Sequence, residues 1–379
     1  MSFADLSLIC LVGLVGPLLA APRRWVLPVV VGELFAGVVI GRTGFALVDA
    51  GDPTFTMLAN LGFALLMFVV GTHVPVRDAR LLAGIRLGLV RAAGTGVLAV
   101  AAAVLLARLT GTDHVGLYAV LMASSSAALV LPVVNGLSLS GPAVLVLLPQ
   151  VAIADAACIV ALPLVIDPAH AARAAVGAVV VLVATVVVFG VLRVLDARGV
   201  RRRVHRISER RGFAAELRIQ LAILFALAGL AVAVHVSVML AGFAFGLAVA
   251  AIGEPRRLAH QLFAVTEGFL APVFFVWLGA GLDLGALGSD PSLIWLGLGL
   301  GVGAALVHLV WALGGQPFSL GLLSAAQLGV PVAAATIGTQ LGVLRPGEAA
   351  AVLLGALLTV ALVVLGANLA LRANPTEAP

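Results

Sequence analysis

The sequence predicts an all-α polytopic membrane protein whose chain crosses the bilayer about thirteen times. Hydrophobic residues make up 62% of the 379 residues, charged residues make up 10%, and the mean hydropathy is +1.20. A soluble domain carries about 25% charged residues, so lipid rather than water must surround most of this chain. Because backbone groups must satisfy one another inside a bilayer, long apolar runs of this kind form helices there.

Thirteen apolar runs approach the length of about 20 residues that a helix needs to cross the hydrocarbon core. No basic segment precedes the first run, so we interpret it as a retained span and not as a secretory signal. Pro and Gly interrupt several of the later runs, which leaves their boundaries approximate. The predicted spans are 5–21, 25–41, 55–72, 84–107, 115–136, 143–166, 174–195, 216–235, 237–252, 262–282, 292–313, 318–342 and 348–371.

The arginines predict the orientation of these spans. All 22 basic residues are arginine, whose charge persists at any relevant pH. If odd-numbered spans run inward, 18 arginines fall on one side and four on the other. Cytoplasmic loops carry the excess of arginine, so we expect the N-terminus outside and the C-terminus in the cytoplasm of a bacterial inner membrane. The cytoplasmic set is Arg23, Arg24, Arg77, Arg80, Arg86, Arg91, Arg193, Arg198, Arg201, Arg202, Arg203, Arg206, Arg210, Arg211, Arg218, Arg256, Arg257 and Arg372, and the outer set is Arg42, Arg108, Arg173 and Arg345.

One long polar stretch, from Arg193 to Arg218, divides the chain near its middle. An arginine cluster can bind nucleic acid, but between two apolar spans contact with anionic lipid headgroups is favoured, so we expect no nucleic-acid partner. The chain is then one transmembrane unit, residues 1–373, with a short cytoplasmic tail at 374–379 and no soluble regulatory domain. Its expected parts are a first half at 5–195, a cytoplasmic loop at 196–215 and a second half at 216–371.

The two halves resemble each other weakly. Residues 33–41 resemble 239–247, residues 65–76 resemble 273–284, and residues 124–134 resemble 324–334, and each match links a span to the one seven later. A shift by an odd number of spans reverses the orientation, so the pattern predicts two inverted-topology repeats, as in many secondary transporters.

Asp155 is the most informative single residue. It is the only charged side chain between Asp113 and Asp167, and it falls near the middle of the span at 143–166. An aspartate at this depth costs about 2.5–3.5 kcal/mol on insertion scales. One interpretation is a protonated acid that is hydrogen-bonded to a neighbouring helix. The other is a site where a proton and a cation compete, because burial disfavours the charged form of the carboxyl.

A lone carboxylate needs further oxygen ligands to hold an alkali cation. Ser124, Ser125 and Ser126 precede Pro132, while Ser324 and Gln327 precede Pro331 at the equivalent place in the second half. Hydroxyl residues near proline favour breaks in membrane helices, where free carbonyls and helix ends can face an ion. Close helix packing is the alternative role for these serines. We expect two discontinuous helices that cross beside Asp155.

Several segments together resemble the sodium/proton exchanger superfamily, in the order in which that superfamily carries its signatures. They are VGELFAGVVIGRTGF (31–45), LGFALLMFVVG (61–71), LMASSSAALVLPVV (121–134), the helix with Asp155, LAPVFFVWLGAGLDL (270–284) and LGLLSAAQLGVPVAAATIGTQLGVL (320–344). The resemblance covers almost the whole chain and is closest to the monovalent cation:proton antiporter branch with bacterial Na⁺/H⁺ antiporters and glutathione-gated K⁺ efflux systems. It implies thirteen helices, a homodimer, and exchange of Na⁺, K⁺ or Li⁺ for H⁺ by alternating access.

The sequence departs from that family at positions that affect ion coupling. Ala154 precedes Asp155 where many members carry a second polar residue, and Gly279, Ala280 and Gly281 stand where electrogenic members carry a lysine or arginine. With one acid and no internal base, we expect one cation per proton, exchanged without net charge.

Four further residues are weaker candidates for the ion site. Gln150 shares a helix with Asp155, and His73 stands where relatives often have a glutamate. His73 could sense pH near its ordinary pKa of about 6.5, or be a satisfied interfacial side chain. Glu33, Asp283 and also Glu267 are interpreted chiefly as interfacial or helix-end charges.

Other functional classes find little support in the sequence. The seven histidines lie on different spans and loops, without metal-ligand spacing and without a nucleophile beside a base, so we expect neither an enzyme nor a bound cofactor. No GxGxxG fingerprint follows a strand pattern, although a separate regulatory subunit is compatible with the sequence. The alternatives left open are an organic-anion symporter on a related fold and a transport-dead membrane sensor or assembly protein, which Ala154 and Gly281 would suit.

Overall fold

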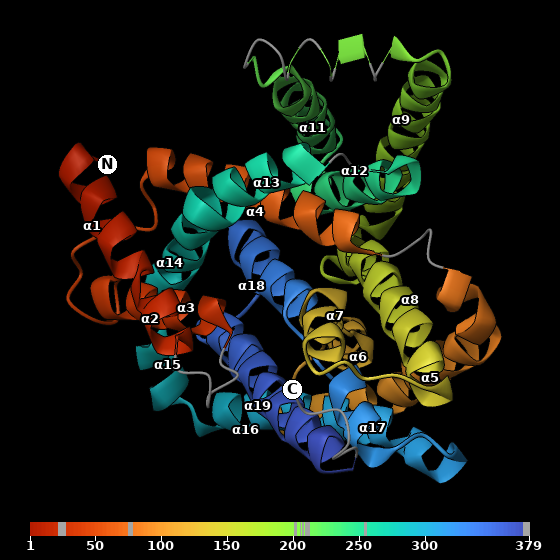
Figure 1. The fold of residues 1–379 in the computed structure, drawn as a ribbon. Helices are drawn as coiled ribbons and strands as arrows, with labels where there is room; N and C mark the ends of the chain where they lie inside the picture. Colours follow the sequence, from red (N-terminus) through yellow and green to blue (C-terminus); the bar gives the residue numbers. More distant parts are fainter. Residues whose placement is uncertain are drawn as a thin grey trace.

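The computed structural model describes residues 1–21, 28–74, 79–200, 203, 204, 206, 208, 213–253 and 256–373, and all regular structure in this part is helical (Figure 1). Ten helices there are long and apolar enough to cross a membrane. Three shorter apolar helices, at Val29–Ile40, Val115–Leu131 and Val238–Ile252, account for the remaining predicted spans. The all-helical class is therefore confirmed. The predicted tail at 374–379, parts of the 196–215 loop, and Arg23, Arg24, Arg77, Arg201, Arg202, Arg210 and Arg211 lie outside the described residues.

In the first half of the chain, the described residues form nine α-helices. They are α1 (Phe3–Gly13), α2 (Val15–Ala20), α3 (Val29–Ile40), α4 (Pro53–His73), α5 (Ala79–Thr110), α6 (Val115–Ala123), α7 (Ala127–Gly136), α8 (Pro142–Val165) and α9 (Ala171–Ala197), with a 3₁₀ turn η1 (Pro168–His170) before α9. The start of α4 follows from its sequence, because Asp52 accepts hydrogen bonds from the Thr54 and Phe55 amides while Pro53 fills the first helical position.

The second half repeats this alternation of long and broken helices. Its elements are α11 (Ala215–Ala233), α12 (Val238–Ile252), α13 (Arg256–Val265), a π-helical turn η2 (Thr266–Leu270), α14 (Ala271–Gly281), α15 (Leu284–Ser289), α16 (Pro291–Leu309), a 3₁₀ turn η3 (Val310–Gly314), α17 (Phe318–Ser324), α18 (Gly329–Leu341) and α19 (Glu348–Ala373). Asp290 and Pro291 start α16 in the way that Asp52 and Pro53 start α4.

Two membrane helices are interrupted near their centres, where the sequence predicts breaks. The first break, at residues 124–126, separates α6 from α7, and the second, at 325–328, separates α17 from α18. At the end of each first half-helix a serine hydroxyl donates back to a carbonyl three residues earlier, Ser124 to Leu121 and Ser324 to Gly321, both at 2.8 Å. Such local bonds offer the backbone an alternative to the helical ladder, and the chain leaves the helix at these points.

Glycines bring two pairs of helices into close contact. A Cβ atom on Gly37 of α3 would lie 2.3 Å from the Val276 carbonyl oxygen of α14, and one on Gly71 of α4 would lie 2.4 Å from the Phe243 oxygen of α12. Small residues allow membrane helices to pack with their backbones in contact. In the predicted inverted repeat, α3 corresponds to α12 and α4 corresponds to α14, so the α3–α14 contact would be the equivalent of the α12–α4 contact. The repeat itself stays a prediction.

Candidate ion site

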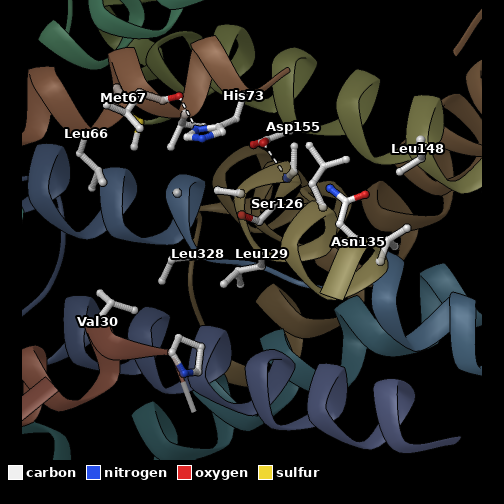
Figure 2. Close-up of a pocket in the computed structure, with 18 of the residues that line it drawn as sticks. Val30, Leu66, Met67, His73, Ser126, Leu129, Asn135, Leu148, Asp155 and Leu328 are labelled. Carbon is white, nitrogen blue, oxygen red and sulfur yellow. Dashed lines mark hydrogen bonds between the residues drawn. The ribbon is translucent and has the colours of Figure 1, made fainter. Parts of the chain in front are cut away.

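A cavity of about 570 Å³ reaches the middle of the helix bundle (Figure 2). Its walls come from the start of α3, the end of α4, the α7 half-helix, the first half of α8, the η2 turn and the start of α18. Most of the lining is apolar, with polar or ionisable side chains from His73, Ser126, Asn135, Asp155 and Glu267 among it. A mostly apolar pocket with a few convergent polar groups is the usual form of a small-ligand site.

Asp155 lies at the inner end of this cavity, held by a helix terminus. The residue is 2% exposed, and its Oδ2 atom accepts a 2.9 Å hydrogen bond from the backbone amide of Ala127. Ala127 is the first residue of α7, so its amide has no partner within its own helix. The N-terminal end of a helix also carries a partial positive charge that favours an anion. The break before α7 therefore supplies both a donor and a favourable dipole to the carboxylate.

The three consecutive serines have different roles in the structure. Ser124 caps the C-terminal end of α6, and its hydroxyl donates to the Leu121 carbonyl of that helix. The Ser125 hydroxyl donates to the Ser324 carbonyl at 2.7 Å and so joins the two breaks. Ser126 directly precedes α7 as its N-cap residue, makes no capping hydrogen bond, and lines the cavity with Asp155. Of the three hydroxyls, the Ser126 hydroxyl is thus placed to coordinate an ion, while the other two stabilise the break.

Gln327 forms the second link between the two breaks. It is 3% exposed, and its Nε2 atom donates to the Leu121 carbonyl at 2.6 Å and to the Ser124 carbonyl at 3.4 Å. Its backbone amide donates to the hydroxyl of Thr359 on α19 at 3.2 Å. The side-chain amide therefore supplies a further donor to two carbonyls at the C-terminal end of α6.

Gln150 and Glu33 are both buried in the interior. Gln150 is 1% exposed, and neither polar atom of its side chain has a hydrogen-bond partner among the described residues. Glu33 is 4% exposed, which differs from the interfacial position expected for it. Glu33 lies one turn inside α3, which begins at Val29 and packs against α2 and α14. Neither residue is among those that line the cavity.

Asp283 lies apart from Asp155, and His73 lies close to the cavity. Asp283 caps α15 by accepting from the Ala286 amide and pairs with Arg42 at 2.5 Å, so it is the helix-end charge that was expected. His73 ends α4 and lines the cavity, with its Nδ1 atom 2.9 Å from the Val69 carbonyl. Figure 2 shows its ring and the Asp155 carboxylate among the cavity side chains.

Sequence reasoning missed three contributors to the cavity. The Ala127 amide has no side-chain signature. Asn135 lies in α7, a segment that the sequence analysis interpreted only as part of a broken helix. Glu267 was ranked as an interfacial charge, although its side chain is exposed and lines the cavity. Its place in an apolar run close to the signature at 270–284 was the one signal that could have raised its rank.

The geometry suits a monovalent cation better than a resident metal. Among the described residues, no group of three or more His, Cys, Asp or Glu side chains could hold a metal ion. The Asp155 carboxylate and the Ser126 hydroxyl, which line the same cavity, provide hard oxygen ligands with a single formal charge. This set can accept either a proton or an alkali cation.

Comparisons with known proteins agree with the fold. A family model described as the transmembrane sodium/hydrogen exchanger matches residues 8–370. The chain is 25% identical over 380 residues to the putative Na⁺/H⁺ antiporter YjbQ of Bacillus subtilis, covering 94% of this chain and 61% of that relative. It is 33% identical over 76 residues to the Na⁺/H⁺ antiporter NhaS5 of Synechocystis, covering 20% of this chain and 11% of that protein. The chain thus spans about three fifths of the first relative.

Solved structures share the same architecture. The sodium proton antiporter MjNhaP1 of Methanocaldococcus jannaschii, in a structure at pH 8, superposes with a TM-score of 0.68 over 99% of this chain and 98% of that chain, at 16% identity. An electron-microscopy structure of the same antiporter gives a TM-score of 0.62 over 100% and 98% of the two chains, at 17% identity. At this level of identity the likeness establishes a common fold.

Proposed function

Because the chain belongs to the transmembrane sodium/hydrogen exchanger family, we propose that it exchanges a monovalent cation, Na⁺, K⁺ or Li⁺, for protons, with Asp155 as the group on which the two ions compete. The observation that carries this proposal is a buried carboxylate that lies on a cavity and is held by the N-terminus of a broken helix. A carboxylate with a fixed donor on one side and open space on the other can exchange its ligand without rearranging its own helix.

The Ser126 hydroxyl completes the proposed ion site. It lines the same cavity and makes no helix-capping bond, so it is free to coordinate a cation that Asp155 holds. Ser125, Ser324 and Gln327 support the site indirectly, because they fix the two breaks against each other.

We further propose that the exchange is electroneutral. At Gly279, where the resemblance to electrogenic members would require a basic residue nearby, an added Cβ atom would lie 2.2 Å from the Leu34 carbonyl oxygen. Close packing of α14 on α3 thus leaves no room for a side chain at this position. A single acid without an internal cation supports exchange of one cation for one proton.

The cavity supports an inward-facing arrangement. Residues 28–30, 73, 139–141, 144 and 145, which line it, come from helix ends that the arginine distribution assigns to the cytoplasm. The proposed topology therefore places the cavity mouth at the cytoplasmic face, with the N-terminus outside.

A homodimer is the proposed assembly. Figure 1 shows α9 and α11 projecting from the bundle, and α9 exposes a row of valines that includes Val176, Val183 and Val187. A second copy and lipid would both suit such a face, and the oligomeric state in detergent distinguishes them.

The test is cation-dependent proton exchange in everted vesicles from a host without its own antiporters. Na⁺, Li⁺ and K⁺ are added in turn to wild type, Asp155→Asn and Asp283→Asn. We expect one or more cations to dissipate the pH gradient with wild type and with the Asp283 variant, which loses a carboxylate outside the cavity. Asp155→Asn should abolish this activity. Equal activity of the Asp155 variant would refute the assignment, and absence of exchange by wild type would favour a non-transporting protein or an organic-anion symporter.

The electroneutral stoichiometry needs its own measurement. In proteoliposomes, a potential-sensitive dye should report no membrane potential during exchange, and a potential that develops with turnover would refute one-for-one exchange.

A further inference from the structure

A second carboxylate shares the cavity with Asp155. Glu267 belongs to the membrane-crossing segment formed by α13, η2 and α14, and its side chain lines the cavity. The residue is exposed although the segment that carries it is largely apolar. Nothing in the ion site described above uses this charge.

The backbone at Glu267 has an uncommon conformation. Residues Thr266–Leu270 form a π-helical turn between two α-helical segments. Such turns insert an extra residue, change the direction in which side chains leave the helix, and occur frequently at functional sites. The hydroxyl of Thr266 is buried without a hydrogen-bond partner among the described residues, so local hydrogen bonding by this side chain does not account for the turn. Continuation of regular α-helix would aim residue 267 in a different direction.

Glu267 lies within electrostatic range of groups from two other helices. One is His73, at the end of α4, and the other is Glu33, buried in α3. His73 also lines the cavity, and its Nδ1 atom donates to the Val69 carbonyl, because a carbonyl can only accept. Its Nε2 atom is then the atom that can gain a proton.

Glu267 and His73 lie on the wall of the cavity that an entering cation would cross. Both residues are exposed, whereas Asp155, on the same cavity, is 2% exposed in the middle of α8. Clefts with low-dielectric walls focus the field of charges that line them and raise the local concentration of oppositely charged solutes. An exposed carboxylate on the cavity wall therefore acts on cations before they reach the buried site.

We propose that Glu267 is a positioning residue for cation entry, a peripheral carboxylate that concentrates monovalent cations in the cavity for transfer to Asp155. The inference rests on the proposed exchange of cations at Asp155 and adds the route by which they arrive. His73 opposes this attraction when it carries a positive charge, because it then neutralises the carboxylate that draws the cation. Glu33 adds negative charge behind Glu267 and works in the same direction as Glu267 when it is ionised.

The experiment compares the cation KM and the maximal rate of wild type, Glu267→Gln, His73→Arg and His73→Asn in everted vesicles. Loss of one charge near the path should raise the KM by about threefold to tenfold at low ionic strength, while the maximal rate changes by less than about twofold because Asp155 still performs the exchange. His73→Arg should raise the KM in the same way, whereas neutral His73→Asn should leave it near wild type. Asp113→Asn, an exposed carboxylate of the α5–α6 loop, is the control for net charge.

A binding measurement separates this inference from the proposed transport. Cation-dependent thermal stabilisation of the purified protein gives a half-saturating concentration without requiring turnover. We expect Glu267→Gln to raise that concentration by the same factor as the KM, and added choline chloride to diminish the difference by screening. An unchanged half-saturating concentration, or a fall in maximal rate at constant KM, would overturn the role of Glu267. If wild type binds cations in a Glu267-dependent manner but exchanges none, the proposed function fails and the entry residue stands.

Discussion

Replacement of Gln327 by leucine tests whether the crossing of the two broken helices depends on a single amide. The side chain is 3% exposed and its strong hydrogen bond, at 2.6 Å, reaches the Leu121 carbonyl across 206 residues of sequence. Leucine is similar in size but cannot donate, so this carbonyl would keep only the Ser124 hydroxyl and amide as donors. Loss of one hydrogen bond of this kind costs about 0.5–1.5 kcal/mol. The second contact, at 3.4 Å, adds little.

The measurement is unfolding in mixed micelles of dodecyl maltoside and sodium dodecyl sulfate, followed by the fluorescence of the four tryptophans. We expect Gln327→Leu to lower the free energy of unfolding by about 0.5–1.5 kcal/mol relative to wild type. Gln340→Leu is the matched control, because Gln340 lies on α18 as an exposed residue bonded to Asn60, and it should change stability by less than about 0.5 kcal/mol. Equal free energies for the two variants would refute the structural role of the Gln327 amide.

Two further predictions concern packing and pH. Gly71→Ala should destabilise the protein by about 1–3 kcal/mol in the same assay, since the new methyl group meets the backbone of α12, whereas Gly96→Ala, with open space around it, should be neutral or stabilising. Gly71→Ala as stable as wild type would contradict the close α4–α12 contact. The hydrogen bond to Glu348 raises the pKa of His114, in the loop before α6, above its ordinary 6.5. Because the pKa of His114 is higher in the folded than in the unfolded state, its interaction with Glu348 stabilises the fold fully below pH 6.5. This stabilisation is lost as the pH rises through the pKa of His114 in the folded state. The melting temperature of wild type should therefore exceed that of His114→Gln most at acidic pH and approach it at alkaline pH, and a difference that grows with pH would contradict this sign.

The fold class followed from the sequence because it depends on quantities that are local. The length of each apolar run is compared with a fixed bilayer thickness, and the thirteen predicted ranges correspond to helices or to broken helices in the structure. The breaks could be predicted for the same reason, since serine hydroxyls compete with the helical ladder in their own turn. The hydrogen bonds that join the two breaks, from Ser125 to the Ser324 carbonyl and from Gln327 to the Leu121 carbonyl, could not be predicted.

The candidate site was only partly predictable. Asp155 stands out because it is the single charge in a long apolar stretch, and the serines stand out by their succession. Glu33 was expected at an interface because it begins a span, yet the neighbouring helices cover it. The periodicity of a membrane helix carries little information about burial, because both its lipid-facing and its protein-facing sides are apolar.

The sequence by itself therefore determined that this chain is a bundle of membrane helices with two interrupted helices and with one acid, Asp155, in the middle of an apolar span. Composition, run length and local hydrogen bonding act within a few residues. Only the tertiary structure decided that the Ala127 amide holds Asp155, that Gln327 caps the end of α6, and that His73 and Glu267 meet at one cavity. These contacts depend on which faces of distant helices turn toward each other. In a bilayer, packing and the pairing of polar groups across the bundle decide which face of a helix turns inward. Neither can be deduced from the sequence of a single segment.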